Sequence, residues 1–278
     1  MSFLITKADG TEEPFDPSKL VKSLRRAGAE EEIISRVAAH VERELKPQMR
    51  TSDIYRHAFQ LLRKEKHGGV AARYSLKRAI LELGPSGFPF EAYIAELFRT
   101  RGYEAQINQI IRGACVEHEV DVVLVKNGIR TFIEAKFHNV VGFKTDLKVV
   151  LYVQSRIRDI DKGKTFPEST RGMVVTNTKF TDVAETYARC EKLELLGWDY
   201  PAGHNLHGFI EEAGLYPTTA LASISRRDKE ALLGEKIVLC KNVPKHADAL
   251  QRIGIRGPRL ARLLEEVGAL CGRPMPSE

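Results

Sequence analysis

Two carboxylates stand at strand-like spacing in the middle of the chain. Residues 119–138 contain two β-branched, apolar runs on either side of Asn127-Gly128, and Asn-Gly is the strongest short-range signal for a two-residue type I′ hairpin turn. In the register set by that turn, Asp121 lies directly opposite Glu134. Unpaired like charges in cross-strand positions destabilise a hairpin, and a hard divalent cation, which takes oxygen ligands, would remove that penalty. The spacing therefore predicts a cation site between Asp121 and Glu134.

A lysine shares the face of these carboxylates. Side chains alternate along a strand, so Lys136 and His138 lie on the same face as Glu134. The intervening positions are apolar and should point into a core: Ile133, Ala135 and Phe137. An acid, an acid and a lysine on paired strands can bind a cation and offset the charge of an anionic substrate. The alternative is a solvated strand face with an ordinary Glu-Lys pair, since Glu-x-Lys alone is common by chance.

Composition sets the limits on what these residues serve. A chain of 278 residues suggests about two domains with a small appendage, and its 43% hydrophobic content is enough for real cores. The net charge of +6 permits polyanionic partners without requiring them. No apolar run approaches the roughly 18 residues of a membrane span, and the N-terminal apolar run is too short for a signal peptide.

The four cysteines form no recognisable motif. They are scattered, without a C-x-x-C pair or a neighbouring histidine pair, so a zinc site or a disulfide framework is not expected. We expect reduced core cysteines in a cytoplasmic protein: Cys115, Cys190, Cys240 and Cys271.

The N-terminal segment predicts a small hairpin followed by four helices. Strand-like runs flank Asp9-Gly10, a hairpin signal. Asp16-Pro17 then combines an N-cap with a proline at the first helical position. Apolar residues recur at helical spacing through three further stretches, the third helix beginning at Thr51 and the last containing Tyr74.

The run ITKADGTEEPFDPSKL within this segment resembles the start of an ATP-cone, the nucleotide-sensing domain of ribonucleotide reductases and their repressor. The resemblance covers about residues 3–85 and implies binding of ATP or dATP without hydrolysis. No G-x-x-x-x-G-K-[ST] loop is present. Carried over by position, the nucleotide-binding candidates are Ile5, Lys7, Glu13, Asp16, Lys19 and Thr51.

Two positions depart from the cone pattern. Ala8 stands where the family often has Arg, and Tyr55 stands where a His commonly follows the Thr. The choice between ATP and dATP is therefore left open, and the alternative is a cone kept as a structural or dimerisation module. Lysines such as Lys7 and Lys19 can still neutralise phosphates as point charges.

The central segment alternates strands and helices after a Gly- and Pro-rich linker at residues 84–90. A helix over 90–101 should precede a strand over 103–111 and the hairpin. A helix over 148–159, a strand over 172–176, a helix over 184–190 and a strand over 193–196 follow. This alternation predicts an α/β sheet.

The central pieces FEAYIAELFRTRGY, EVDVVLV, FIEAK and GMVVTNTKFTDVA resemble, in this order, the Mrr-like restriction endonucleases of the PD-(D/E)xK type. The resemblance covers about residues 87–200. It implies a catalytic set of Glu91, Asp121, Glu134 and Lys136, with Glu96 as the alternative to Glu91. Gln154, on the following helix, takes the place of a supporting polar residue.

The chemistry that this resemblance implies is phosphodiester hydrolysis. Asp121 and Glu134 would ligate Mg²⁺ or Mn²⁺, which polarises the scissile phosphate and lowers the pKa of a bound water. Lys136 would orient or deprotonate that water and offset phosphate charge. His138 is expected to be a flanking residue rather than a second base.

The C-terminal segment, from residue 201, is mostly helical by pattern. Helices are expected over 206–213, 218–225, 228–233, 247–252 and 258–267, with a short strand at 237–240. The run IGIRGPRLARLL loosely resembles a helix-hairpin-helix, which holds DNA phosphate without reading sequence. The DNA-binding candidates are Arg252, Arg256, Arg259 and Arg262. The alternative is a plain helical appendage that packs on the nuclease domain.

The sequence therefore predicts an α/β protein with a restriction-endonuclease-like core and a mixed sheet. The expected domains are an ATP-cone (1–86), an Mrr-like nuclease (87–200) and a helical tail (201–278). The expected function is a metal-dependent DNA endonuclease regulated by ATP or dATP, with no membrane partner and a homodimer or higher homo-oligomer as its assembly. Two alternatives remain open: a nucleotide-responsive DNA-binding regulator on an inactive nuclease fold, and a structural assembly factor.

Overall fold

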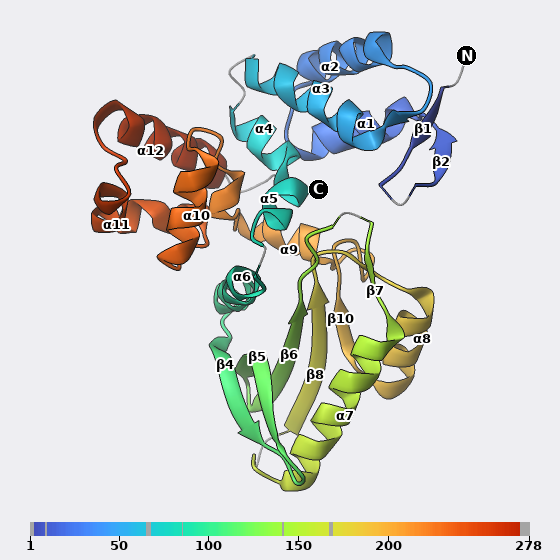
Figure 1. The fold of residues 1–278 in the computed structure, drawn as a ribbon, viewed down its shortest axis with the longest axis vertical. Helices are drawn as coiled ribbons and strands as arrows, with labels where there is room; N and C mark the ends of the chain where they lie inside the picture. Colours follow the sequence, from blue (N-terminus) through green and yellow to red (C-terminus); the bar gives the residue numbers. More distant parts are fainter. Residues whose placement is uncertain are drawn as a thin grey trace. The chain divides into compact units, whose positions relative to one another are not determined.

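The computed structural model describes residues 3–8, 10–64, 68–84, 86–140, 142–166 and 169–272. The predicted turn residue Asp9 and the linker residue Pro85 lie outside these ranges. The chain divides into two compact units, one formed by Met1–Ala79 with Tyr216–Glu278 and the other by Ile80–Leu215. Figure 1 labels the elements of both units.

The unit of residues 80–215 is built on a mixed five-stranded sheet with the order β10-β8-β6-β5-β4. The strands β4, β5 and β6 form an antiparallel meander, and β8 runs parallel to both β6 and β10. This confirms the expected α/β fold with a mixed sheet. The strands are β4 (Glu104–Arg112), β5 (Glu117–Lys126), β6 (Ile129–Lys136), β8 (Ser169–Thr176) and β10 (Glu194–Leu196).

Helices cover both faces of this sheet. Phe132 of β6 is buried in a core that contains Val153 of α7 and Ala184 of α8. On the opposite face of β6, Phe137 packs against Phe90 of α6, with ring centroids 5.5 Å apart. The helices are α6 (Phe88–Arg99), α7 (Leu147–Gly163), α8 (Asp182–Glu191) and α9 (Leu206–Ala213), and a two-stranded sheet joins β7 (Lys144–Thr145) to β9 (Lys179–Phe180).

The hairpin register is the one that the Asn-Gly turn predicts. Backbone pairing runs from Lys126↔Ile129 to Val122↔Ile133. The two turn residues have positive φ, 52° at Asn127 and 71° at Gly128, as a type I′ turn requires. The two carboxylates therefore emerge just beyond the last paired residues, at the point where β5 and β6 begin to separate.

The cone segment forms a three-stranded sheet, β2-β1-β3, packed with helices. The third strand was not predicted, because two residues are too few to show alternation and their parallel partner lies far away in the sequence. The predicted last helix is divided at Ser75 into α4 and α5. The elements are β1 (Leu4–Thr6), β2 (Glu12–Pro14), α1 (Pro17–Arg26), α2 (Glu31–Glu44), β3 (Met49–Arg50), α3 (Thr51–Lys64), α4 (Gly68–Tyr74) and α5 (Leu76–Leu81).

The C-terminal segment is helical, with two corrections. The predicted helix at 218–225 is only a 3₁₀ turn, because Ser225 forms a capping box with Asp228 and starts the next helix instead. The predicted strand at 237–240 is a single bridge between Pro217 and Leu239. The elements are η1 (Thr218–Ala220), α10 (Arg226–Gly234), η2 (Cys240–Lys245), α11 (Ala247–Arg252) and α12 (Gly257–Cys271).

The two units divide the predicted tail. The hydroxyl of Thr219 donates to the carbonyl of Ala79 at 2.6 Å within the cone unit. In the central unit, the Tyr93 hydroxyl donates to the carbonyl of Leu215 at 2.7 Å. Residues 201–215 thus belong to the central unit and 216–272 to the cone unit, whereas the sequence grouped them as one tail. The exact domain boundaries remain a prediction.

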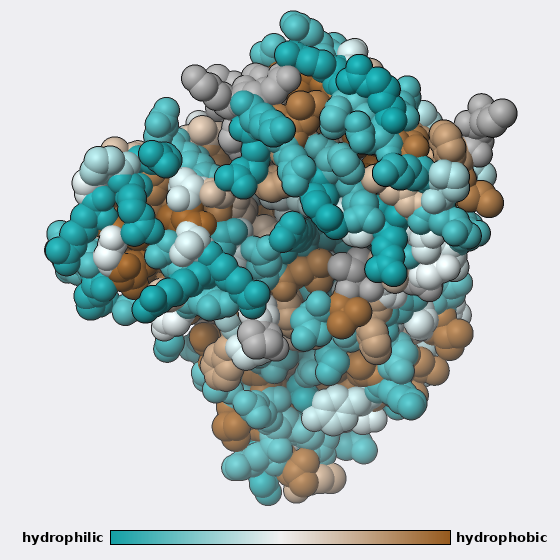
Figure 2. Space-filling model, turned by 45° about the horizontal axis from the view of Figure 1, so that its top comes forward, coloured by the Kyte–Doolittle hydropathy of each residue, from teal (hydrophilic) through white to brown (hydrophobic). Residues whose placement is uncertain are grey.

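Hydrophilic side chains cover much of the face drawn in Figure 2, with apolar residues in separate patches. Within the described ranges, no helix has the length and apolar character needed to cross a membrane. Cys240 is buried, but Cys115 and Cys190 are exposed, so the expectation of core cysteines is wrong for these two; all four cysteines are free thiols.

Candidate active site

Asp121 lies in β5 where the antiparallel pairing with β6 ends. Its Oδ2 accepts a hydrogen bond from the backbone N–H of Ala135 at 2.8 Å. The side chain thus replaces a backbone acceptor and ties the two strands together one residue beyond the ladder. Burial, together with the charge of Glu134, raises the pKa of Asp121 to about 6.

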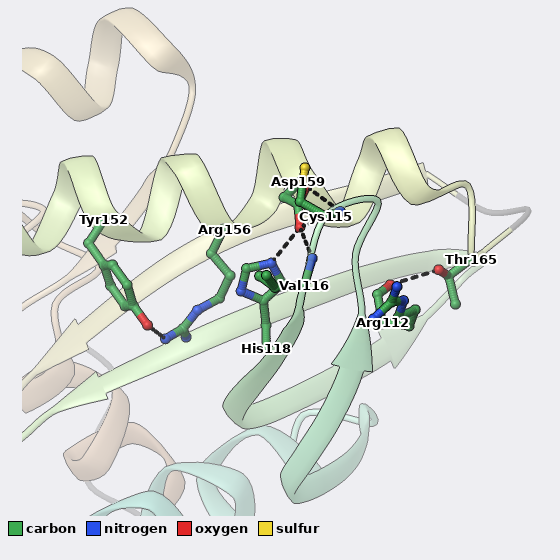
Figure 3. A network of polar contacts seen from close by, with 8 residues as sticks. All are labelled: Arg112, Cys115, Val116, His118, Tyr152, Arg156, Asp159 and Thr165. Atoms are coloured by element: carbon green, nitrogen blue, oxygen red, sulfur yellow. Dashed lines mark hydrogen bonds and ion pairs between the residues drawn. The ribbon is translucent and has the colours of Figure 1, made fainter.

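Glu134 faces α7 and meets an arginine there. The Nη1 of Arg156 donates to Glu134 Oε2 at 2.8 Å, and its Nη2 donates to the hydroxyl of Tyr152 at 2.8 Å. Figure 3 shows Tyr152 and Arg156 side by side along α7. Arg156 is only 7% exposed, so Glu134 has a buried cationic partner.

Arg156 was not predicted from the sequence, where Gln154 was expected to be the supporting polar residue. The amide of Gln154 instead donates to Glu191 of α8 at 3.1 Å, away from Glu134. A signal for Arg156 was present in the sequence. It stands three residues after Val153 and four before Ile160, on the buried face of the helix, where an unpaired charge is costly.

Glu91 belongs to the same electrostatic group as the two strand carboxylates. Burial, and then the charges of Asp121, Glu119 and Glu134, raise its pKa to about 7. Glu119, two residues before Asp121 in β5, was not among the predicted residues. The alternative candidate Glu96 forms an ion pair with Arg99 at 2.5 Å instead. Glu91 is therefore coupled electrostatically to Asp121 and Glu134, and its catalytic role stays a prediction.

Lys136 is the last residue of β6 and is half-buried. Within the described part of the chain, its ammonium group makes no hydrogen bond or ion pair. Its charge contributes, after burial, to lowering the pKa of His138. Lys136 is therefore a cation on the face of Glu134 whose charge is not already committed to a carboxylate.

His138, two residues after Lys136, is held by a buried polar network. Its backbone N–H donates to Asn177 Oδ1 at 2.8 Å, and Asn177 Nδ2 donates to its carbonyl at 2.7 Å. Its ring Nε2 lies 3.0 Å from Thr145 Oγ1, which donates to Thr176 Oγ1 at 3.1 Å. His138 thus anchors the end of β6, and its flanking role in the site stays a prediction.

The two strand carboxylates fit a hard divalent cation. Asp121 commits Oδ2 to Ala135, and Glu134 commits Oε2 to Arg156. Each carboxylate keeps its other oxygen without a partner among the described residues. In the described ranges, no group of three or more His, Cys, Asp or Glu side chains is placed so that it could hold a metal ion. Mg²⁺ is usually held by one or two carboxylates with waters and phosphates, so Asp121 and Glu134 could hold it.

A second network holds α7 against the turn between β4 and β5. Asp159 Oδ2 lies 2.8 Å from His118 Nε2, and Oδ1 accepts the backbone N–H of Cys115 at 3.0 Å. Figure 3 shows Asp159 reaching from α7 to this turn, with Thr165 and Arg112 joined beyond it. The hydrogen bonds from His118 and Cys115 lower the pKa of Asp159. The same helix that carries Arg156 is therefore pinned to the sheet.

The predicted nucleotide-binding residues of the cone lie around the β1–β2 hairpin. Ile5 is buried and pairs with Glu13 across the hairpin. Glu13 forms ion pairs with Lys7 at 2.7 Å and with Lys19 at 2.9 Å, which lower its pKa. Asp16 caps α1 through the backbone N–H of Ser18 at 2.9 Å, and Thr51 is the first residue of α3.

The four predicted DNA-binding arginines surround the turn between α11 and α12, and all are exposed. Arg252 pairs with Glu235 at 2.6 Å and Arg259 with Asp228 at 2.9 Å. Arg256 donates to the carbonyl of Gln251 at 3.2 Å. Arg262, one turn into α12, makes no ion pair within the described residues. Two helices joined by a turn lie where the sequence pattern predicted them, and the DNA-binding role of the four arginines stays a prediction.

Comparisons with known proteins identify all three segments. Family models match an ATP cone domain at residues 3–82, a restriction endonuclease of the Mrr catalytic type at 84–199 and an AF1548-like C-terminal domain at 216–271. These matches confirm the fusion that the sequence pieces indicated.

The chain is also similar to individual proteins. An uncharacterized protein of Archaeoglobus fulgidus is 36% identical over 184 residues, which are 64% of this chain and 100% of the relative. The crystal structure of a protein of unknown function, AF1548, has a TM-score of 0.57 at 32% identity and covers 68% of this chain and 100% of its own. The MspJI restriction endonuclease in complex with a 27-mer oligonucleotide has a TM-score of 0.34 at 15% identity, covering 72% and 37%.

Proposed function

The chain belongs to the AF1548-like family, and from this premise we propose that it is a metal-dependent DNA endonuclease regulated by an adenine nucleotide. Its restriction endonuclease domain and ATP cone domain suggest a nuclease with nucleotide regulation.

The observation that carries the proposal is the grouping at the separating ends of β5 and β6. Asp121 and Glu134 each present one oxygen without a partner among the described residues, and Lys136 follows on the face of Glu134. This is a set of groups that can hold a cation and a phosphate together. A solvated strand face would not bury these carboxylates or raise the pKa of Asp121 to about 6.

In this proposal Asp121 and Glu134 hold Mg²⁺ or Mn²⁺, with Glu91 nearby as a further acid. When bound, the ion polarises the scissile phosphate and lowers the pKa of a water molecule. Lys136 orients that water and offsets the charge that develops on the phosphate. Because Lys136 is uncommitted, it can make these contacts without first breaking an ion pair.

The regulatory part of the proposal concerns Lys7 and Lys19. Both lysines contact Glu13, at 2.7 and 2.9 Å, so their charges meet at one point beside the hairpin. Phosphates of ATP or dATP would compete with this carboxylate for the same two cations. Replacement of the Glu13 carboxylate by phosphate would break the ion pairs of Glu13 when the nucleotide binds, and this can alter the conformation of the cone. ATP and dATP are both candidate ligands.

The DNA-binding part of the proposal concerns the tail arginines. Exposed guanidinium groups around the turn between α11 and α12 suit phosphate contacts, which give affinity without sequence readout. A homodimer or higher homo-oligomer would supply two active sites, one to cut each strand of a duplex.

A second candidate function is a nucleotide-responsive DNA-binding regulator on an inactive nuclease fold. The buried contact between Arg156 and Glu134 favours it, because this arginine already neutralises one of the two carboxylates. Such a regulator would bind DNA but would not need Mg²⁺ at Asp121 and Glu134.

Cleavage of supercoiled plasmid tests the proposal. Wild type, Lys136→Ala and the control Lys148→Ala, an exposed lysine of α7, are compared with Mg²⁺ across ATP and dATP concentrations. Nicking or linearisation that is lost only in Lys136→Ala and changes with nucleotide supports the whole proposal. Activity indifferent to nucleotide would retain the nuclease and remove the regulation. DNA binding without cleavage by wild type would favour the regulator.

A further inference from the structure

Arg156 is a buried cation that contacts Glu134, one of the two candidate metal ligands. It is 7% exposed, donates through Nη1 to Glu134 and through Nη2 to Tyr152, both at 2.8 Å, and lies with its guanidinium carbon 4.6 Å from the centroid of the Tyr152 ring. Its Nε is buried without a hydrogen-bond partner among the described residues.

This arrangement is costly for a residue that serves stability alone. A buried guanidinium loses its hydration, and replacing a buried ion pair by apolar residues is often neutral or stabilising. The orphaned Nε adds a further desolvation penalty. The neighbouring positions on this face of α7 are apolar core residues, such as Val153, Ile157 and Ile160. An aliphatic side chain at position 156 would match them.

The contact is specific for one oxygen of Glu134. Arg156 holds Oε2, and Oε1 has no partner within the described residues. Asp121 shows the same division, since Ala135 holds Oδ2 and leaves Oδ1. Both candidate ligands are therefore fixed by one oxygen and open at the other. Outer partners that orient metal ligands act in this way.

We propose that Arg156 is a positioning residue for metal binding: it anchors Glu134 through Oε2 so that Oε1 is presented beside Asp121 to a divalent cation. This inference rests on the metal site of the proposed function. Tyr152 acts one step further out, since its hydroxyl fixes the second arm of the guanidinium. The opposite role is a latch, in which Arg156 competes with the cation for Glu134 and weakens its binding.

Direct titration of the full chain with Mn²⁺, without DNA, by isothermal calorimetry separates these roles. Arg156→Met removes both the charge and the donors, and Arg156→Gln keeps a donor without the charge. Loss of an outer partner typically weakens metal binding about 10- to 100-fold. We expect that loss in Arg156→Met, a smaller one in Arg156→Gln, and no change in the control Arg158→Met, an exposed arginine of the same helix paired with Glu191.

Mn²⁺ binding by Arg156→Met that equals or exceeds that of wild type would overturn the proposal, as the latch predicts tighter binding. Thermal unfolding without metal shows whether this variant folds. If it does not, Tyr152→Phe decides, because it removes only the hydroxyl that supports Arg156. We expect about 2- to 5-fold weaker Mn²⁺ binding, and unchanged binding would count against the proposal.

The outcome stays separate from that of the nuclease proposal. Wild type that binds Mn²⁺ but cleaves no nucleic acid would refute the enzyme, while the Arg156 series would still report on positioning. Wild type whose Mn²⁺ binding is absent, or is unaffected by Glu134→Gln, would overturn the positioning role, whatever the plasmid assay shows.

Discussion

Asp121 and Ala135 are joined by a hydrogen bond of 2.8 Å from the backbone N–H of Ala135 to the carboxylate. The backbone ladder between β5 and β6 stops one residue earlier, at Val122 and Ile133. One carboxylate oxygen therefore completes the strand pairing, and the other is left for chemistry. The same residue serves the fold and the proposed site, and the two roles can be separated by substitution.

Asp121→Asn and Asp121→Ala should differ in stability but not in metal binding. Asn keeps an acceptor for the Ala135 N–H, so the free energy of unfolding should remain close to that of wild type. Ala leaves a buried donor unsatisfied, which costs about 1–3 kcal/mol. Both remove the charge and should abolish Mn²⁺ binding at this site. Urea unfolding and Mn²⁺ titration check the two effects, and equal stability of the two variants would contradict the structural role.

Glu91→Gln should stabilise the metal-free protein at high pH only. The pKa of Glu91 is raised to about 7 from an ordinary value of 4.5, so its contribution to stability is full below pH 4.5 and lost as the pH rises through 7. Gln resembles the protonated acid. Because Glu91 is partly exposed and solvent screens its charge, the gain in the free energy of unfolding at pH 8 should be only about 1 kcal/mol. This gain should vanish at pH 4.

Thermal unfolding in chelator at both pH values measures this difference. Glu96→Gln is the matched control, because Glu96 lies on the same helix but pairs with Arg99. A gain in Glu91→Gln that is the same at pH 4 and pH 8 would show that Glu91 is not held near its carboxylate neighbours.

Asp159→Asn should destabilise the central unit without weakening metal binding. Hydrogen bonds from His118 and Cys115 lower the pKa of Asp159 below its usual 3.8. The stability from this carboxylate is therefore present above pH 3.8 and lost as the pH falls through the lower folded value. At pH 7 the variant should unfold at a lower temperature than wild type, and the gap should narrow in acid. A difference in unfolding temperature that persists or widens below pH 3.8 would show that the Asp159 carboxylate is not stabilised by these hydrogen bonds.

Glu13→Gln should strengthen nucleotide binding by the cone. The carboxylate forms ion pairs with both Lys7 and Lys19, so its removal takes away one competitor of phosphate at these two lysines. We expect the dissociation constant for ATP to fall about 3- to 10-fold, because the carboxylate no longer competes with the phosphates. Lys19→Ala should weaken binding. Calorimetric titration with ATP and dATP decides, and weaker binding by Glu13→Gln would make Glu13 a direct ligand.

Arg256→Ala combined with Arg262→Ala should lower DNA affinity and its salt dependence. Each phosphate contact contributes about one to the slope of log affinity against log salt, so the double variant should lose about two. Arg226→Ala is the control, because Arg226 is exposed in α10 and pairs with Glu230. Fluorescence anisotropy across salt concentrations measures the slope. An unchanged slope would leave the tail without a role in DNA binding.

The sequence alone determined the features that depend on neighbours along the chain. The turn at Asn127-Gly128 sets the register of β5 and β6, so Asp121 and Glu134 could be brought together from a count of residues. The cap at Asp16 and the proline at position 17 placed the start of α1 (Pro17–Arg26). Such signals are local, because a turn dihedral or a capping hydrogen bond involves residues only a few positions apart.

The tertiary structure decided what depends on contacts between distant segments. The rotation of α7 over the sheet turns Arg156 toward Glu134 and Gln154 toward Glu191, two side chains that differ by half a turn of helix. The C-terminal helices join the cone unit, while residues 201–215 remain with the sheet. The pKa of Glu91 is raised by burial and also by the charges of carboxylates on other elements. Packing fixes these relationships, since periodicity defines which face of a helix is apolar but not which partner that face meets.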